Sequence, residues 1–292
     1  LFRSIGISVQ GATLRALKAI GVLDRCVASG FPYSSLIACD VNGKVTGTVD
    51  LPPLLGAGYP ECVGMMRNVL QDILREAMMA AGVPWRLGLT VDSLEQDEAG
   101  VDGRFSDGST GRYDLVVGAD GIHSKVRDLV FGTAQAPQDM GQAVWRAMVR
   151  RPPEVQARYM FFGPRSKAGF NPVSREEMYV FLVQTGHPRL RDDELAPVMR
   201  GMLADFGGLV AEVRDQIQRP ERIAYRPFSS MLLPAPWYRG RVVLVGDAAH
   251  CPTPQMASGA GMAVEDTIVL SELLGGELSL KARSEEHTSE LQ

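Results

Sequence analysis

Two short apolar runs, each followed by glycine and aspartate, constrain this 292-residue chain more than any other feature. Residues 241–245 (RVVLV) lead into Gly246 and Asp247, and residues 115–117 (LVV) lead into GADG, residues 118–121. Short apolar runs that end at glycine are typical of buried strands. In open α/β sheets, ligands bind beyond the carboxyl ends of the strands. The sequence therefore predicts an α/β fold with ligand-binding groups at two strand ends.

The residues at these two ends indicate the kind of ligand. An ionised carboxylate only accepts hydrogen bonds, so Asp120 and Asp247 suit the hydroxyls of a ribose or ribityl chain and would repel phosphate. Glycine next to each carboxylate lets a ligand approach the backbone. Further along, SGAG at 258–261 predicts a helix start, whose N–H groups and dipole favour an anion. A reduced flavin offers both groups, a polyol chain and a ring edge that becomes anionic.

The same residues also have simpler interpretations. Asp120 and Asp247 could be ordinary helix N-caps, a position that aspartate favours. Gly259 and Gly261 could belong to a loop that merely precedes a helix. His250 invites a catalytic role, but no partner is visible in the sequence, and we favour a structural one. Cys251 is interpreted as a small packed residue rather than a nucleophile.

The rest of the chain alternates between helical and strand patterns. Apolar spacing predicts helices over 8–23, closed by Gly21, and over 66–82. Residues 31–60 predict a hairpin that turns at Asn42-Gly43, and 83–110 predict short strands separated by Ala-Gly and Asp-Gly turns. Residues 141–233 predict strands interrupted by a helix over 193–206, with a second helical stretch at 215–218.

These patterns predict a Rossmann-like α/β domain interleaved with a β-sheet domain. The first, expected to bind the cofactor, comprises 1–140 and 236–282, and 31–60 is a candidate contributor to the substrate side. The second, expected to bind the substrate, comprises 141–235. The polar tail RSEEHTSELQ, 283–292, matches the translation of a common sequencing adapter, so we expect it to be non-native; a natural polar terminus is the alternative.

Composition excludes several other classes. The net charge is −4 and no basic run stands out, so nucleic acid is not an expected partner. No apolar segment reaches the roughly 18–20 residues of a membrane helix. The first residues lack the basic start and following apolar stretch of a signal peptide, so we expect none. The four cysteines and four histidines have no metal-binding or redox spacing, so we expect no metal and a reducing, cytoplasmic setting. The sequence indicates no oligomeric state.

Three stretches make the sequence resemble the flavoprotein aromatic hydroxylases, the single-component FAD monooxygenases typified by p-hydroxybenzoate and salicylate hydroxylases. YDLVVGADGIHSKVR, 113–127, is similar to the family's DG motif, and the stretch from Gly240 to Leu274 is similar to its GD motif and flavin-facing helix. The helical segments within 6–24 and 65–74 match the intervening helices. The family's GxGxxG fingerprint and acidic ribose-binding residue are absent, and we expect them upstream of Leu1.

The resemblance implies roles for individual residues. Asp247 would hold the FAD ribityl chain, Gly246 would leave room for the cofactor, and Pro254 would line the active site beside the flavin. The remaining expected FAD contacts are Arg67, Asp120, Gly121, Arg127, Gly259, Ala260 and Gly261. Arg67 could instead be a solvated helix-face arginine, and Arg127 could fix its own turn through a salt bridge. No side chain is assigned as a catalytic acid or base.

The resemblance also implies the activity. NAD(P)H would reduce the FAD, and O2 would form a flavin C4a-hydroperoxide that hydroxylates a small aromatic substrate, a phenolic or heteroaromatic acid. Arg146, Arg158 and Arg226 are candidate partners of its carboxylate. The alternatives are a hydroxylase of quinone biosynthesis, an epoxidase of the same fold, a flavin-binding regulator without turnover, or a fragment without activity.

Overall fold

The computed structural model describes residues 5–164 and 166–276, and these form two compact units. Unit 1 contains residues up to Leu87, Pro137–Ser230 and Thr253–Ser258. Unit 2 contains Gly88–Ala136, Met231–Pro252 and the chain from Gly259 onward. The tail at 283–292 lies outside the described residues. The roles expected for 1–140 with 236–282 and for 141–235 stay predictions.

Unit 1 is built on a large, mostly antiparallel sheet. From one edge its strands are β14 (Ile223–Leu232), β10 (Gln138–Arg150), β13 (Glu177–Thr185), β12 (Lys167–Pro172), β11 (Arg158–Phe162), β3 (Ser35–Asp40) and β4 (Val45–Asp50). Only β11 and β3 pair in parallel. Side chains alternate between the two faces of a strand, so Trp145 and Ala147 of β10 belong to one core, whereas Val144 and Met148 belong to another.

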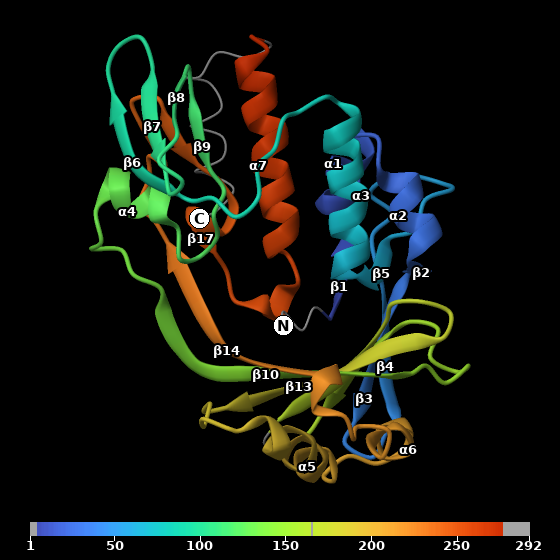
Figure 1. Cartoon of the computed structure of the whole chain (residues 1–292). Helices are drawn as coiled ribbons and strands as arrows, with labels where there is room; N and C mark the ends of the chain where they lie inside the picture. The colour runs from blue at the N-terminus through green and yellow to red at the C-terminus, as the bar shows by residue number, and fades with distance from the viewer. Residues whose placement is uncertain (1–4, 165, 277–292) are drawn as a thin grey trace. The chain divides into compact units, whose positions relative to one another are not determined.

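Helices cover the Trp145 face of this sheet. In Figure 1, α5 (Asp192–Leu203) and α6 (Leu209–Arg214) lie against it, and Met199 and Leu203 are fully buried there with Trp145 and Phe170. The opposite face, which carries Arg146, has no helix in its apolar cluster. Both faces of the sheet therefore carry an apolar core, and the second face also carries Arg146.

A second layer of unit 1 comes from the beginning of the chain. Strands β1 (Gly6–Gln10), β5 (Cys62–Met66) and β2 (Phe31–Tyr33) form a small antiparallel sheet, and helices α1 (Ala12–Ala19), α2 (Leu23–Ser29) and α3 (Arg67–Ala80) pack with it around a separate apolar core. Hydrogen bonds from Tyr33 Oη to Ser8 Oγ (3.1 Å) and from Ser8 Oγ to Asn171 Oδ1 (3.4 Å) link this layer to the large sheet.

Unit 2 contains two small sheets. One has the order β15 (Tyr238–Arg239), β16 (Val242–Leu244), β9 (Val116–Gly118), and the other has the order β6 (Val91–Gln96), β7 (Val101–Phe105), β8 (Thr110–Tyr113). The helices are α4 (Lys125–Phe131) and α7 (Gly259–Leu274). The short β17 (His250–Cys251) pairs with the end of β14 at Met231 and Leu232.

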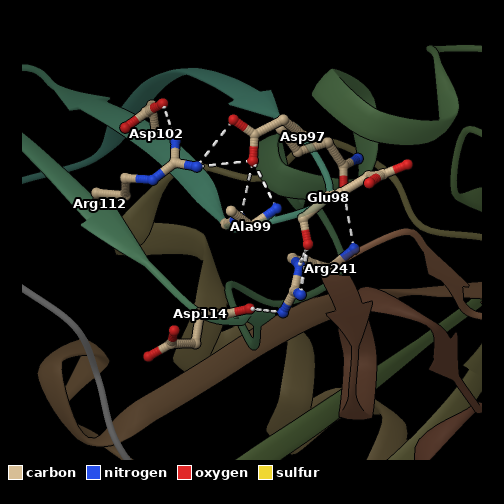
Figure 2. Close-up of polar contacts among 9 residues, drawn as sticks. Asp97, Glu98, Ala99, Asp102, Arg112, Asp114 and Arg241 are labelled. Carbon is tan, nitrogen blue, oxygen red and sulfur yellow. Dashed lines mark hydrogen bonds and ion pairs between the residues drawn. The ribbon is translucent and has the colours of Figure 1, made fainter.

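Arg241 fixes the strand that carries the Gly-Asp turn. Its guanidinium donates to the main-chain oxygens of Glu98 (2.6 and 3.0 Å) and Asp114 (3.0 Å), as Figure 2 shows. On the neighbouring hairpin, Arg112 binds Asp97 and Asp102. The arginine at the start of the predicted strand thus anchors it to the β6–β8 sheet.

Most predicted elements are present, including the 66–82 helix, the hairpin at Asn42-Gly43 and the paired short strands within 83–110. Two predictions were wrong. The segment from residue 8 to 10 is the end of strand β1, because pairing with β5 overrides the helical pattern, and the helix begins only after Gly11. The second helical stretch lies at Leu209–Arg214, while 215–218 forms tight turns closed by Gln216 N–H to Val213 O and Ile217 N–H to Arg214 O.

Candidate functional site

The two predicted strand ends lie side by side in unit 2. Strands β9 and β16 pair in parallel, with Val243 opposite Val117 and Leu244 opposite Gly118. The pairing extends to a hydrogen bond from Val245 N–H to Gly118 O (3.0 Å). Because both strands run in the same direction, the Asp120 turn and the Asp247 turn leave the sheet at the same edge.

Asp120 binds the start of its own helix. One carboxylate oxygen accepts from Ser124 Oγ, and the other accepts from the N–H groups of Lys125 (2.7 Å) and Val126 (3.1 Å). Ser124 in turn accepts from Arg127 N–H (2.9 Å). The N-cap of α4 is Ser124, so the interpretation of Asp120 as the N-cap itself was wrong, although Asp120 does accept from N–H groups of the first turn. A contact from Asp120 to a cofactor stays a prediction.

Arg127 connects the two motifs. The side chain is only 2% exposed, and its guanidinium donates to Ile122 O (2.9 Å) and, across the unit, to Ala248 O (3.1 Å). Its Nε is buried and has no hydrogen-bond partner among the described residues. The arginine therefore ties the turn after β9 to the turn after β16, which its sequence alone did not indicate.

Gly246 is needed for helix packing. Its φ is +58°, a conformation that side chains disfavour, and a Cβ there would lie 2.8 Å from the Cβ of Ala263 on α7. The role expected for Gly246, leaving room for the cofactor, stays a prediction. Gly121 differs, since its φ is +84° and a Cβ there would meet no atom within 4 Å.

The Asp247 side chain is exposed, unlike most of its neighbours at 242–250. It lies close to the beginning of α7: Asp247 Oδ1 is 3.9 Å from the position that a Cβ would occupy at Gly259. Gly259 and Ala260 are the first residues of that helix and Gly261 is buried in it. A carboxylate acceptor and a helix N-terminus with free N–H groups are thus adjacent, as the sequence predicted.

Asp266 is the functional-site candidate that sequence reasoning missed. Its Oδ2 accepts from Gly246 N–H (2.7 Å) and lies 2.6 Å from His250 Nε2. Burial by itself would lower the pKa of His250, but the hydrogen bond and charge of Asp266 outweigh it and raise that pKa. His250 therefore has the partner that the sequence did not show. A carboxylate within the apolar stretch GMAVEDTIVL was the available signal.

Cys251 holds its proton at neutral pH. Burial, followed by the negative charge of Asp247, raises the pKa of this thiol to about 11. Since the thiolate is the nucleophilic form of cysteine, the structure favours the packed, unreactive interpretation of Cys251.

Positively charged side chains gather in unit 1 on the Val144 face of the large sheet. Burial lowers the pKa of Arg146, and the nearby charges of Arg67 and Arg158 lower it further. Among the described residues, the one ionisable neighbour that raises the pKa of Arg146 is Tyr179, and its side chain is a phenol rather than a carboxylate. Arg158 has a buried Nε without a partner and lies over the Phe181 ring, 5.8 Å from its centroid.

The other residues predicted from sequence in this unit are more exposed than Arg146 and Arg158. Arg67 is exposed at the first turn of α3. Arg226 is exposed and donates to the main-chain oxygen of Tyr225 (3.1 Å). Pro254 is exposed at the start of a short 3-10 turn, Pro254–Met256.

A cleft in unit 1 lies beside the positive cluster. Its volume is about 310 Å³, and its lining includes Lys167, Phe162, Val183, Gln142 and Gln255. Burial, and then the charge of Arg158, lower the pKa of Lys167. Gln255, next to Pro254, donates to Gln142 Oε1 (2.8 Å) across the cleft wall. The cleft combines an apolar wall with amide and ammonium groups.

Comparisons with known proteins identify the family. A family model described as "FAD binding domain" matches residues 2–289. The 2-heptyl-3-hydroxy-4(1H)-quinolone synthase of Pseudomonas aeruginosa is 30% identical over 277 residues, which cover 92% of this chain and 70% of that protein. The chain therefore belongs to this family, and its resemblance to the flavoprotein aromatic hydroxylases is confirmed.

Solved structures agree with the sequence relatives. HpxO of Klebsiella pneumoniae, complexed with FAD and uric acid, has a TM-score of 0.78 at 25% identity and covers 92% of this chain and 70% of its own. The 2-methyl-3-hydroxypyridine-5-carboxylic acid oxygenase has a TM-score of 0.74 at 26% identity, with 92% and 71% covered. The predicted α/β fold of an FAD-dependent monooxygenase is thereby confirmed.

No helix among residues 5–164 and 166–276 combines the length and the apolar character that crossing a membrane requires.

Proposed function

We propose that the protein hydroxylates a small aromatic acid, with FAD as cofactor, NAD(P)H as reductant and O2 as the oxygen source. The observation that carries the proposal is the pairing of an exposed Asp247 carboxylate with the start of α7 in a chain of the FAD-binding family. The substrate class is supported by a relative named as a quinolone synthase and by a structural neighbour named as the oxygenase of a pyridine carboxylic acid.

The residues of unit 2 fit the chemistry of FAD. Asp247 offers an acceptor to a ribityl hydroxyl, and the open space at Gly121 would admit a ligand to the backbone. The first N–H groups of α7, from Gly259 and Ala260, would donate to the pyrimidine edge of the ring, where negative charge develops on reduction. Bound FAD would supply hydride acceptance and oxygen activation.

The substrate side is assigned to unit 1. Arg146 and Arg158, with Lys167 at the nearby cleft, form a positive cluster partly withdrawn from water. A guanidinium in such a setting gains most from a carboxylate, because a charge-assisted hydrogen bond strengthens as water is excluded. Phe162 and Val183 would contact the apolar ring. Arg67 and Pro254 remain predictions for the cofactor and the active-site wall.

The test uses the purified protein. The visible spectrum reports bound flavin, and absorbance at 340 nm follows NAD(P)H oxidation against a panel of aromatic acids and their matched amides. We expect flavin bands, oxidation stimulated by an acid but not by its amide, and a hydroxylated product. Flavin bands without stimulation or product would overturn the hydroxylase proposal in favour of a reductase or regulator.

Two arginine variants sharpen the substrate assignment. Arg158→Met should raise KM for the acid about tenfold or more, because it removes a half-buried charge but keeps the length of the side chain. Arg226→Met is the matched control, since Arg226 is exposed and donates only to its own strand. Equal effects of the two substitutions would contradict the assignment of Arg158.

A further inference from the structure

We propose that Asp266 is a positioning residue for cofactor binding: its carboxylate, shared between Gly246 N–H and the His250 imidazole, holds the turn that presents Asp247. The proposal rests on the proposed FAD-binding role of Asp247 and extends it to a residue on a different element. All of the residues involved lie in unit 2.

The shared carboxylate oxygen restrains the turn from both sides. Asp266 Oδ2 accepts from Gly246 N–H at 2.7 Å, immediately before Asp247, and from His250 Nε2 at 2.6 Å, three residues after it. The Asp266 side chain is 18% exposed and that of His250 is 5% exposed, so water competes little for these bonds. Hydrogen bonds to a charged group in such a setting are stronger than neutral ones.

The turn needs this restraint because its backbone is unusual. Gly246 has a φ of +58°, and glycine loses more conformational freedom on ordering than any other residue. A Cβ at Gly246 would lie 2.8 Å from Ala263, which is on the same helix as Asp266. Helix α7 therefore fixes the turn both by contact and by hydrogen bond, while the Asp247 carboxylate itself remains exposed.

The imidazole is held in place independently of Asp266. Its ring lies 4.8 Å from the Trp237 ring at an interplanar angle of 36°, and Trp237 Nε1 donates to Leu233 O (2.7 Å). An ionised carboxylate only accepts hydrogen bonds, so Nε2 of His250 is the donor to Asp266. Nδ1 is buried without a hydrogen-bond partner among the described residues. The charged groups that act on the imidazole are Asp266 and Asp247, both carboxylates.

The experiment compares Asp266→Ala and Asp266→Asn with the parent protein. Alanine removes the acceptor, whereas asparagine keeps an acceptor oxygen and removes the charge. FAD affinity, measured by flavin fluorescence well below the unfolding temperature, should weaken about tenfold or more in Asp266→Ala, as for other residues that orient a ligand-binding group, and less in Asp266→Asn. Asp114→Asn, which removes an exposed carboxylate from the same unit, is the matched control and should leave the affinity unchanged.

A second readout does not depend on FAD. The imidazole NMR signals, assigned with the His250→Gln variant, report the pKa of His250. This pKa should fall in Asp266→Asn, because burial remains while the negative charge of Asp266 is lost. An unchanged His250 pKa in Asp266→Asn would contradict the interaction between Asp266 and His250, and this test remains available even if Asp266→Ala fails to fold.

The outcomes separate this proposal from the proposed function. A parent protein that binds no FAD contradicts the proposed function, while the His250 titration still tests the pair. If Asp266→Ala and Asp266→Asn bind FAD as tightly as the unsubstituted protein does, Asp266 has no positioning role and the proposal is overturned. Lower thermal stability with unchanged FAD affinity would make Asp266 purely structural and would overturn the proposal as well.

Discussion

The two turns at the edge of the β9–β16 sheet share a sequence pattern but use their aspartates differently. Both carboxylate oxygens of Asp120 accept hydrogen bonds at the start of its own helix, from Ser124 Oγ and from the N–H groups of Lys125 and Val126. Asp247 is exposed, and a different carboxylate, that of Asp266, binds the backbone of its turn. Both side chains are exposed, so the difference between the turns lies in what their carboxylates bind: Asp120 binds the start of its own helix, whereas at the other turn Asp266 binds the backbone in place of Asp247.

The largest change in stability that we expect comes from replacing Arg127, the residue that joins the two turns. Arg127→Met should lower the free energy of unfolding by about 3 kcal/mol, because Ile122 O and Ala248 O would lose their donors in a buried setting. Chemical denaturation measures the loss. Arg112→Met removes an exposed arginine from the same unit and should cost far less. A similar loss in both variants would show that Arg127 does not join the turns.

Asp247→Ala should separate binding from stability. We expect FAD affinity to weaken by roughly ten- to a hundredfold, equivalent to about 1.5–3 kcal/mol for a hydrogen bond to a charged group. The melting temperature of the FAD-free protein should stay close to that of the parent, since the side chain is exposed. Fluorescence titration and a thermal melt provide the two measurements. A large drop in the melting temperature would show that Asp247, like Asp120, stabilises the fold.

Asp120→Ala should show the reverse pattern. The loss of its hydrogen bonds to the first N–H groups of α4 should lower the free energy of unfolding by about 1 kcal/mol, the usual net magnitude for a hydrogen bond. FAD affinity should change less than in Asp247→Ala. If Asp120→Ala instead loses FAD without losing stability, the two turns are equivalent, and the comparison fails.

The smallest expected effect is a pH dependence at the Asp247 turn. The pKa of folded His250 lies above its ordinary value, so the charged pair contributes stability that is fully present below the unfolded pKa. That contribution is lost as the pH rises through the folded pKa. The difference in stability between the parent and Asp266→Asn should therefore shrink from pH 6 to pH 9, as followed by denaturant unfolding. A difference that grows with pH would contradict the charged pair.

The sequence predicted most of the scaffold of the candidate site. The strands at β9 and β16, the α7 start at Gly259 and the hairpin at Asn42-Gly43 were all visible, because local apolar patterns and turn residues specify such elements. The N-terminal strand was mistaken for helix, since its identity depends on pairing with β5, about fifty residues away in the chain. Spacing alone cannot show such a partner.

The sequence by itself determined where chemistry is located: two carboxylates that follow apolar strands, and glycines where the backbone adopts unusual angles. Both carboxylates are exposed, and only the tertiary structure decided which of them binds its own helix. The helix after β9 folds back onto Asp120 within six residues, whereas Asp266 reaches the Gly246 turn from α7, across twenty residues of chain. Likewise, the packing of the large sheet placed Arg146 and Arg158 in one positive cluster and left Arg226 exposed. Hydrogen bonds between distant residues form only once the chain has packed, so a linear pattern cannot assign them.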